Sequence, residues 1–263
     1  MAFSHNPRIV TSNLMWMMDF ADRNIWNGST VSDDHTMNDV VGRGYNPKFR
    51  NTSWTGQTAN YGGTVTGDGS ADYLTVGESL SSALKLKLHW ASGALNTGMS
   101  SDLTWEIWIK TSDTGGGNRM IISRPWHGSG VYNYRMGVSY LTIQAHSSGN
   151  NTPSSATRNF TTIATGNWTH LVVTISSTTI QAYINGTLDS SGAHGLTAHG
   201  APPNGHSTFF TAIGTIYPYG GSWAGNDGFT LDAEWGVVKM YDKVLSANEV
   251  LQNFNALRGR YGV

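Results

Sequence analysis

The dipeptide Asn185-Gly186 is the feature of this sequence that most restricts its fold. Both central residues of a type I′ turn need positive φ angles, which asparagine and glycine tolerate better than other residues. An alternating run at residues 179–184 ends directly at this dipeptide, and a second apolar run precedes it at residues 168–175. The pattern therefore predicts antiparallel strands and a tight hairpin turn.

Strand signals recur along most of the chain. Residues 103–110 are apolar at every odd position, and Trp108 adds an apolar residue on the other face. Because irregular loops of such length are uncommon, we expect short strands within the polar segment 21–63 as well. Further strands are predicted at residues 14–20, 72–76, 120–122, 134–144 (two strands around a turn near Ser139), 209–213 and 229–241. Only 13% of the residues are charged and 32 are glycine, which argues against a helical bundle.

One helix is predicted, near the C-terminus. Ser246 and Glu249 have the spacing of a capping box, in which each side chain accepts a hydrogen bond from the other residue's amide. Gly259 is the expected residue just beyond the helix. The apolar face that should pack on the strands consists of Val250, Leu251, Phe254 and Leu257. The pattern as a whole predicts an all-β fold, an antiparallel β-sandwich with one short C-terminal helix.

Charge and cysteine content narrow the function classes. The net charge is −1 and no basic stripe is visible, so we expect no nucleic-acid partner. The chain has no cysteine, which rules out disulfides and thiolate zinc sites. The N-terminus lacks a signal-peptide pattern and the apolar run 14–18 is too short to span a bilayer, so we expect synthesis in the cytoplasm and no membrane insertion.

The first residues are expected to differ from the rest of the chain. We predict an N-terminal arm or edge segment over residues 1–12 and a single sandwich domain over residues 13–263. Residues 2–10 are polar and include Pro7, and we expect them to make intermolecular contacts, with a capsid or with a sister subunit. The alternative is a frayed or self-packed terminus.

Five segments resemble the consensus of one known family. Residues 66–73 (TGDGSADY) are similar to its F-D-G-x-D-D-Y segment, and residues 103–110 (LTWEIWIK) to its F-T-V-E-A-W-V-K strand. Residues 167–174 (NWTHLVVT) resemble W-H-H-V-V-V-T, residues 182–186 (AYING) resemble L-Y-V-N-G, and residues 238–246 (VKMYDKVLS) resemble V-R-I-Y-N-R-A-L-S. The family is that of the laminin-G-like domains, and the resemblance implies a concanavalin A-like jelly roll.

The closing segment, residues 249–262, resembles the end of this domain in virion proteins of tailed phages, especially marine and cyanobacterial ones. That resemblance implies a virion structural protein, a capsid decoration or a fibre or appendage protein, located on the virion. The implied partners are other virion proteins of the capsid or tail and glycans of the host surface. A homo-oligomer is expected, with a trimer as its form. The alternative is a bacterial carbohydrate-binding module or lectin without virion association.

An enzymatic function would require carboxylates that this sequence does not offer together. Sandwich glycosidases of the laminarinase type carry Glu-x-Asp-x-(x)-Glu on one strand, which supplies the two carboxylates that flank the sugar bond. Here Glu106 is followed by Trp108 and Lys110 where carboxylates would stand. Asp232 and Glu234 share a strand face, but such pairs are more often solvated or paired with a cation. We therefore expect no catalytic residues and no enzyme.

Two groups of residues offer metal ligands. Calcium needs ~6–8 oxygen ligands, so the two oxygen-rich loops would have to meet. Their carboxylates are Asp68, Asp72 and Asp227. Asp68-Gly69 equally suits an ordinary turn. The histidines of the loop at residues 193–206 are His194, His199 and His206, but their spacing fits no standard helix site for zinc, and a solvated loop is the simpler interpretation. We expect no cofactor, with calcium left open as an alternative.

Aromatic residues in loops are the candidates for sugar binding. An exposed ring presents a flat apolar face to sugar C–H groups, while nearby polar groups supply hydrogen bonds. The candidate glycan-binding residues are Trp126, Tyr132, Tyr217, Tyr219 and Trp223. The alternative is that these rings cover edges of the core or pack between subunits.

Overall fold

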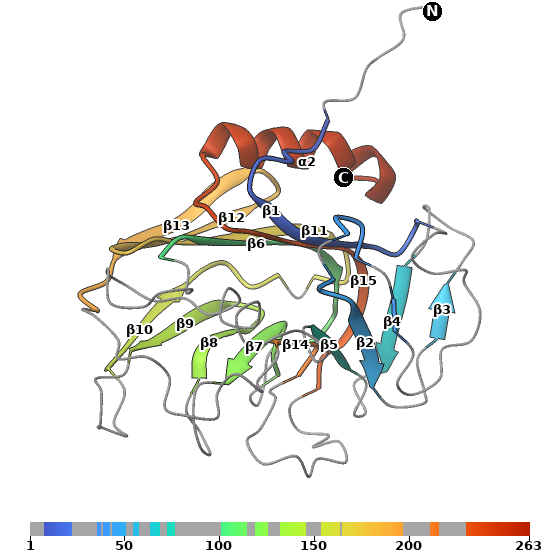
Figure 1. The fold of residues 1–263 in the computed structure, drawn as a ribbon, viewed down its shortest axis with the longest axis horizontal. Coiled ribbons are helices and arrows are strands. Elements are labelled where there is room, and N and C mark those ends of the chain that lie inside the picture. The colour runs from blue at the N-terminus through green and yellow to red at the C-terminus, as the bar shows by residue number, and fades with distance from the viewer. Residues whose placement is uncertain are drawn as a thin grey trace, which may run out of the picture.

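The computed structural model describes residues 8–22, 36–37, 39–42, 44–50, 55–57, 64–68, 73–76, 101–114, 119–125, 132–145, 154–163, 165–196, 211–215 and 230–263. Within these residues, two antiparallel sheets form a sandwich, and the C-terminal helix lies on the outside of the larger sheet (Figure 1). The predicted fold class, an antiparallel β-sandwich with one C-terminal helix, is confirmed.

The larger sheet has eight strands in the described part of the chain. Its order is β13 (Thr187–Ala193), β12 (Thr179–Ile184), β11 (Trp168–Ile175), β6 (Leu103–Lys110), β15 (Asp232–Tyr241), β4 (Thr64–Asp68) and β3 (Thr55–Gln57). The eighth strand, β1 (Leu14–Asp19), pairs with the second half of β15, while β4 pairs with its first half. The long strand β15 therefore holds three neighbours in place.

The second sheet has seven strands in the described residues. Its order is β10 (Ser154–Asn159), β9 (Tyr140–Ala145), β8 (Tyr132–Met136), β7 (Ile122–Pro125), β14 (Thr211–Ile213), β5 (Tyr73–Val76) and β2 (Pro47–Arg50). The core fills the space between the sheets, and its large side chains include Trp16, Trp105 and Trp235. The polar segment 21–63 contains β2 and β3, as expected.

The strongest local patterns produce the elements that they predict. Strands β6, β11 and β12 have the expected bounds, and Asn185 (φ 50°) and Gly186 (φ 79°) form the positive-φ turn after β12. The strand expected at residues 120–122 is shifted along the chain: it begins at Ile122 and ends at Pro125, while the Ile121 amide already donates to the Met136 carbonyl of β8 at 2.8 Å. Strands β4, β10 and β13 were not predicted.

Strand β6 has two faces with different neighbours. Leu103, Trp105, Ile107 and Ile109 point into the core between the sheets, as the alternation predicts. Glu106 and Trp108 lie on the opposite face and are fully buried as well. That second face is covered by the helix α2 (Ala247–Tyr261), which extends across the larger sheet in Figure 1.

Helix α2 begins where the capping box predicts. The Glu249 amide donates to Ser246 Oγ at 3.3 Å, and the Ser246 amide donates to Glu249 Oε2 at 2.9 Å. Val250 and Phe254 pack on the sheet, but the prediction that Leu251 is packed there is wrong, since 44% of it is exposed. Leu251 lies ~100° around the helix from Val250, outside the stripe of contacts. Among the described helices, none combines the length and apolarity needed to cross a membrane.

The end of the helix differs from the prediction. Gly259 lies within α2, and Gly262, with a φ of 71°, is the left-handed residue that ends it. The helix continues because Tyr261 is buried against Trp108 and Trp168. Tyr261 also lies so close to Gly236 that a Cβ atom there would collide with the phenol ring.

Residues 8–12 of the expected arm lie against the sandwich itself. The Val10 amide donates to Asn253 Oδ1 at 2.7 Å, and the Val10 carbonyl accepts from the Tyr241 hydroxyl at 3.1 Å. Gln252 Nε2 donates to the Arg8 carbonyl at 2.6 Å. The self-packed alternative thus holds from Arg8 onward, while residues 1–7 lie outside the described residues.

Candidate functional site

Most of the predicted binding residues lie outside the described part of the chain. These are Trp126, Tyr217, Tyr219 and Trp223 for glycans, Asp72 and Asp227 for calcium, and His199 and His206 for zinc. Tyr132 is the first residue of β8, opposite Pro125, and Asp68 is the last residue of β4, opposite Asp232. The glycan site and the calcium site predicted from these residues therefore stay predictions.

Two other sequence candidates have partners within the domain. His194 is buried, and its Nε2 lies 3.0 Å from the Ser176 carbonyl oxygen. Glu234 accepts a hydrogen bond from Lys110 Nζ at 2.7 Å, the cation-paired arrangement considered for that carboxylate. Within the described ranges, no three histidine, aspartate or glutamate side chains gather as metal ligands would.

The buried face of β6 carries a cluster of polar residues around Glu106, here called the Glu106 cluster: Glu106, His170, Lys239, Tyr241 and Asn253. Lys239 Nζ donates to Glu106 Oε1 at 2.6 Å, and Asn253 Nδ2 donates to Oε2 at 2.6 Å. The Tyr241 hydroxyl lies 3.3 Å from Oε2 and also receives a bond from Asn253 at 3.0 Å. Both carboxylate oxygens are thus occupied from three elements, β15, β11 and α2.

The protonation states of the Glu106 cluster follow from burial and charge. Burial raises the pKa of the Glu106 carboxyl, but Lys239 and the His170 hydrogen bond outweigh it and lower that pKa to about 2. Burial lowers the pKa of His170, which keeps its ring neutral. Because an ionised carboxylate can only accept, His170 Nε2 carries the proton and donates to Glu106 Oε1 at 3.1 Å.

Aromatic rings seal the Glu106 cluster from solvent. Trp108 stacks on Phe254 with ring centroids 5.9 Å apart and on Tyr261 at 4.4 Å. His170 lies 4.9 Å from the Trp108 ring on the same face. Since Glu106 is fully buried beneath these rings, its carboxylate has no path to a polysaccharide. The arrangement instead attaches helix α2 to the larger sheet.

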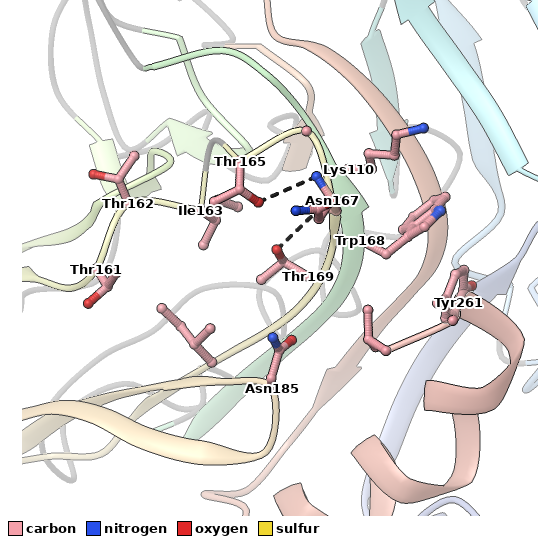
Figure 2. Close-up of a pocket in the computed structure, with 14 residues that line it drawn as sticks. Lys110, Thr161, Thr162, Ile163, Thr165, Asn167, Trp168, Thr169, Asn185 and Tyr261 are labelled. Atoms are coloured by element: carbon pink, nitrogen blue, oxygen red, sulfur yellow. Dashed lines mark hydrogen bonds between the residues drawn. The ribbon is translucent and has the colours of Figure 1, made fainter.

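A pocket of about 700 Å³ opens beside this covered region, here called the end pocket. Lys110 at the end of β6, the loop at residues 161–167, Trp168 and Thr169 at the start of β11, Asn185 of the hairpin turn and Tyr261 of α2 line it (Figure 2). Figure 2 places the threonines of the loop on one side and the Trp168–Tyr261 pair on the other. The wall combines hydroxyls and amides with two aromatic rings and with the aliphatic side chains of Ile163, Ile184 and Val263.

The loop that forms one wall of the end pocket is fixed at three points. Thr161 donates through its amide and its hydroxyl to the Asp189 carboxylate at 2.8 and 2.7 Å. Ile163 is buried and its amide donates to the Val138 carbonyl at 3.0 Å. The Gly166 amide donates to the Thr111 carbonyl at 3.0 Å. These contacts join the wall to both sheets, so the shape of the pocket is set by the fold.

Sequence reasoning missed these residues for different reasons. Lys239 and Asn253 each interrupt an apolar stripe, on β15 and on α2, and a buried polar residue in such a stripe signals a polar partner. The end pocket gives no comparable signal, because its threonines and asparagines look like ordinary loop residues in the sequence.

The architecture is that of an antiparallel two-sheet β-sandwich whose larger sheet is covered on its outer face by α2. Residues 68–251 match the family model of the concanavalin A-like lectin/glucanases superfamily, to which the chain therefore belongs. A comparison with curated proteins gave no match.

Two solved structures with the same fold are binding domains of toxins. The binding domain of Paraclostridial Mosquitocidal Protein 1 has 13% identity and a TM-score of 0.57, with 93% of this chain and 52% of that chain covered. The receptor-binding domain of botulinum neurotoxin type G has 13% identity and a TM-score of 0.55, with 92% and 51% covered. This chain thus spans about half the length of either toxin domain.

A third similar structure matches over its whole length. Domain 4 of the arabinanase AbnA from Geobacillus stearothermophilus, in complex with arabinotriose, has 12% identity and a TM-score of 0.55, with 92% of this chain and 98% of that chain covered. At such low sequence identities, the three structures show only that they have the same fold as this chain.

Proposed function

We propose that this protein is a non-enzymatic carbohydrate-binding domain that is displayed on the particle of a tailed phage. The observation that carries the non-enzymatic assignment is the burial and ion pairing of Glu106. The superfamily name covers lectins and glucanases. In this chain the one glutamate on the strand where glucanase carboxylates would stand is fully buried and ion-paired with Lys239, which favours the lectin function.

Two further observations support binding of carbohydrate. The named functions of the similar structures are receptor binding and, for the arabinanase domain, a complex with arabinotriose. The described residues also include a pocket with hydroxyl, amide and aromatic groups, which are the groups that proteins use to hold sugars.

The virion location rests on the resemblance of residues 249–262 to the ends of phage virion domains. On the particle the protein would serve as a capsid decoration or as a fibre or appendage protein, in contact with other capsid or tail proteins, and its sandwich would face host-surface glycans. A homo-oligomer is part of this proposal, with a trimer as the expected state. Light scattering after size-exclusion chromatography measures that state directly.

A glycan array with the purified protein tests the carbohydrate part. We expect binding to a subset of glycans without release of reducing sugar from β-glucans, and arabinotriose belongs on the array as a probe. Sugar release that Glu106→Gln abolishes while the variant stays folded would overturn the non-enzymatic assignment.

Electron microscopy of labelled particles tests the location. Antibody against this protein should decorate phage particles at a defined position. Glycan binding together with unlabelled particles would favour the alternative, a bacterial carbohydrate-binding module or lectin.

A further inference from the structure

We infer that the end pocket is the glycan site of this protein and that it takes a neutral sugar in preference to one that carries a carboxylate. The inference rests on the proposed function, to which it adds a place and a class of ligand. Four properties of the pocket carry it: its open polar groups, the fixed backbone beneath them, its aromatic wall and its charge.

The wall of the end pocket has neutral polar groups that are not used within the domain. The carboxamide of Asn167, the Nδ2 of Asn185 and the hydroxyl of Thr162 make no side-chain hydrogen bond to any other residue that the structure describes. A sugar hydroxyl both donates and accepts, so amides and hydroxyls match it without any buried charge. The set therefore fits a polyhydroxylated ligand.

The backbone that carries Asn167 and Asn185 is held in place before a ligand arrives. The Asn185 amide donates to the His170 carbonyl at 2.9 Å, and Asn185 Oδ1 accepts from the His170 amide at 3.0 Å. The paired turn leaves Nδ2 as the free half of that carboxamide. The Asn167 amide donates to Thr165 Oγ1 at 3.4 Å, and the Asn167 carbonyl accepts from Thr169 Oγ1 at 3.5 Å, as Figure 2 shows. Binding would then require little ordering of the backbone that carries these side chains.

The aromatic wall supplies the apolar contact. Trp168 and Tyr261 both line the end pocket, and their ring centroids are 4.6 Å apart. Both are largely buried, so each is held rigidly with a small part of its surface at the pocket. The C–H groups of a sugar ring pack on surfaces of this kind while its hydroxyls reach the opposite, polar side.

Charge selects between neutral and acidic sugars. Among the described lining residues, Lys110 has the one charged side chain, and its ammonium lies 2.7 Å from the Glu234 carboxylate. A sugar carboxylate would have to compete with the Glu234 carboxylate for the Lys110 ammonium, and the two carboxylates would repel each other. A neutral sugar meets no such competition. The Lys110–Glu234 pair therefore acts as the specificity determinant.

Calorimetry with paired ligands tests the inference. The probes are the best-bound neutral oligosaccharide from an array of neutral and uronic-acid glycans, and its counterpart with one carboxylate. We expect the neutral ligand to bind more tightly. Asn167→Ala should weaken its binding about tenfold, the effect of one or two hydrogen bonds. Asn248→Ala, an exposed asparagine on α2 away from the pocket, is the matched control and should bind as wild type.

A second variant tests the charge argument separately. Glu234→Gln frees Lys110 and should strengthen binding of the acidic counterpart about fivefold, the scale of one exposed ion pair, without loss of the neutral ligand. Neutral-glycan binding that Asn167→Ala leaves unchanged, or equal binding of both probes to the wild type, would overturn this inference and leave the proposed function standing. Absence of binding to every glycan on the array would overturn both. Circular dichroism and thermal melts of each variant confirm that it is folded.

Discussion

The Glu106 cluster and the end pocket share strands β6 and β11, yet one is sealed and the other is open. Strand β6 contributes Glu106 to the cluster and Lys110 to the pocket, and β11 contributes His170 and Trp168 in the same way. Strand β15 contributes Lys239 to the cluster. The same strand also carries Glu234, which pairs with Lys110. The difference is helix α2, which covers the middle of these strands and ends at Tyr261 beside the pocket.

The comparison shows that the energetic role of an ion pair depends on whether it is buried or exposed. Beneath α2 the Glu106 carboxylate is fully buried, so every partner that it has must stay in place or an unpaired charge is left in the interior. At the pocket the Lys110–Glu234 pair is about one-third exposed, and water can replace either partner. The Glu106–Lys239 pair therefore stabilises the fold, whereas the Lys110–Glu234 pair can open so that one partner contacts a ligand.

The largest effect is expected when the buried cation is removed. Lys239→Ala leaves the Glu106 carboxylate buried without its counter-charge and should lower the free energy of unfolding by about 3–5 kcal/mol. Chemical denaturation at pH 7 measures this. The double variant Glu106→Gln/Lys239→Met, which removes both charges, should recover most of the loss. A cost below about 1 kcal/mol for Lys239→Ala would mean that the buried pair does not stabilise the Glu106 cluster.

Acid should weaken the covered region more than the pocket. The pKa of Glu106 is about 2 in the folded protein and near its ordinary 4.5 when unfolded, so between these values the unfolded state binds more protons. Its stabilisation, of the order of 3 kcal/mol, is present above about pH 4.5 and is lost as the pH falls toward 2. Because burial lowers the pKa of His170, the unfolded state also binds more protons at this residue below about pH 6.5, so His170 too lowers the stability as the pH falls.

Denaturation midpoints at several pH values between 7 and 2.5 check this acid sensitivity. The double variant Glu106→Gln/Lys239→Met is the control, because it lacks the carboxylate that titrates. If wild type and double variant lost stability in parallel on acidification, other groups would be responsible.

Removal of the ring that seals the Glu106 cluster should cost about 3 kcal/mol. Phe254 is 9% exposed and stacks on Trp108, so Phe254→Ala leaves a cavity above the cluster. The melting temperature should fall accordingly, whereas Leu251→Ala, at an exposed position of the same helix, should have little effect. An unchanged melting temperature together with lost particle binding would make α2 a binding element instead of a structural one.

The start of α2 should contribute less than its packed face. Ser246→Ala removes the side chain that accepts from the Glu249 amide and should cost about 1 kcal/mol. Ser246→Thr keeps an oxygen at that position and is the matched control. The two variants would be equally stable if the cap had no role.

The smallest effect is expected at the exposed pair. Lys110→Ala should change the free energy of unfolding by less than about 1 kcal/mol, because both side chains of the pair remain partly solvated. The same denaturation experiment as for Lys239→Ala gives a direct comparison of two lysine–glutamate pairs that share one sheet. A loss comparable with that of Lys239→Ala would remove the distinction between the two regions.

The elements that sequence reasoning located are those with a local signal. Residues 103–110 alternate, Asn185-Gly186 needs positive φ angles, and Ser246 with Glu249 forms a cap, all within a few residues. Strands β10 and β13 were missed because their sequences, SSATRN and TLDSSGA, are polar and largely exposed. Each is an edge strand whose one neighbour, β9 or β12, determines its pairing.

The candidate site was harder to predict because its residues are distant in sequence. The interpretation of Glu106 as non-catalytic rests on what its strand lacks, whereas its partners Lys239 and Asn253 lie 133 and 147 residues further on. The end pocket likewise joins Lys110, Asn167, Asn185 and Tyr261. No window of sequence contains such a set, and only the order of strands in the larger sheet brings it together.

The position of β15 has a consequence for the way this chain folds. Strand β15 is synthesised after every strand that it pairs with, and it bonds to β6, β4 and β1. Until residue 241 has been made, β6 lacks the neighbour that joins it to β4 and β1, so the larger sheet exists only in separate parts. Pairings over such sequence separations are slow to form, and they leave strand edges exposed in the meantime. The sandwich should therefore close late and in one step, with β15 and α2 as the segments that complete it.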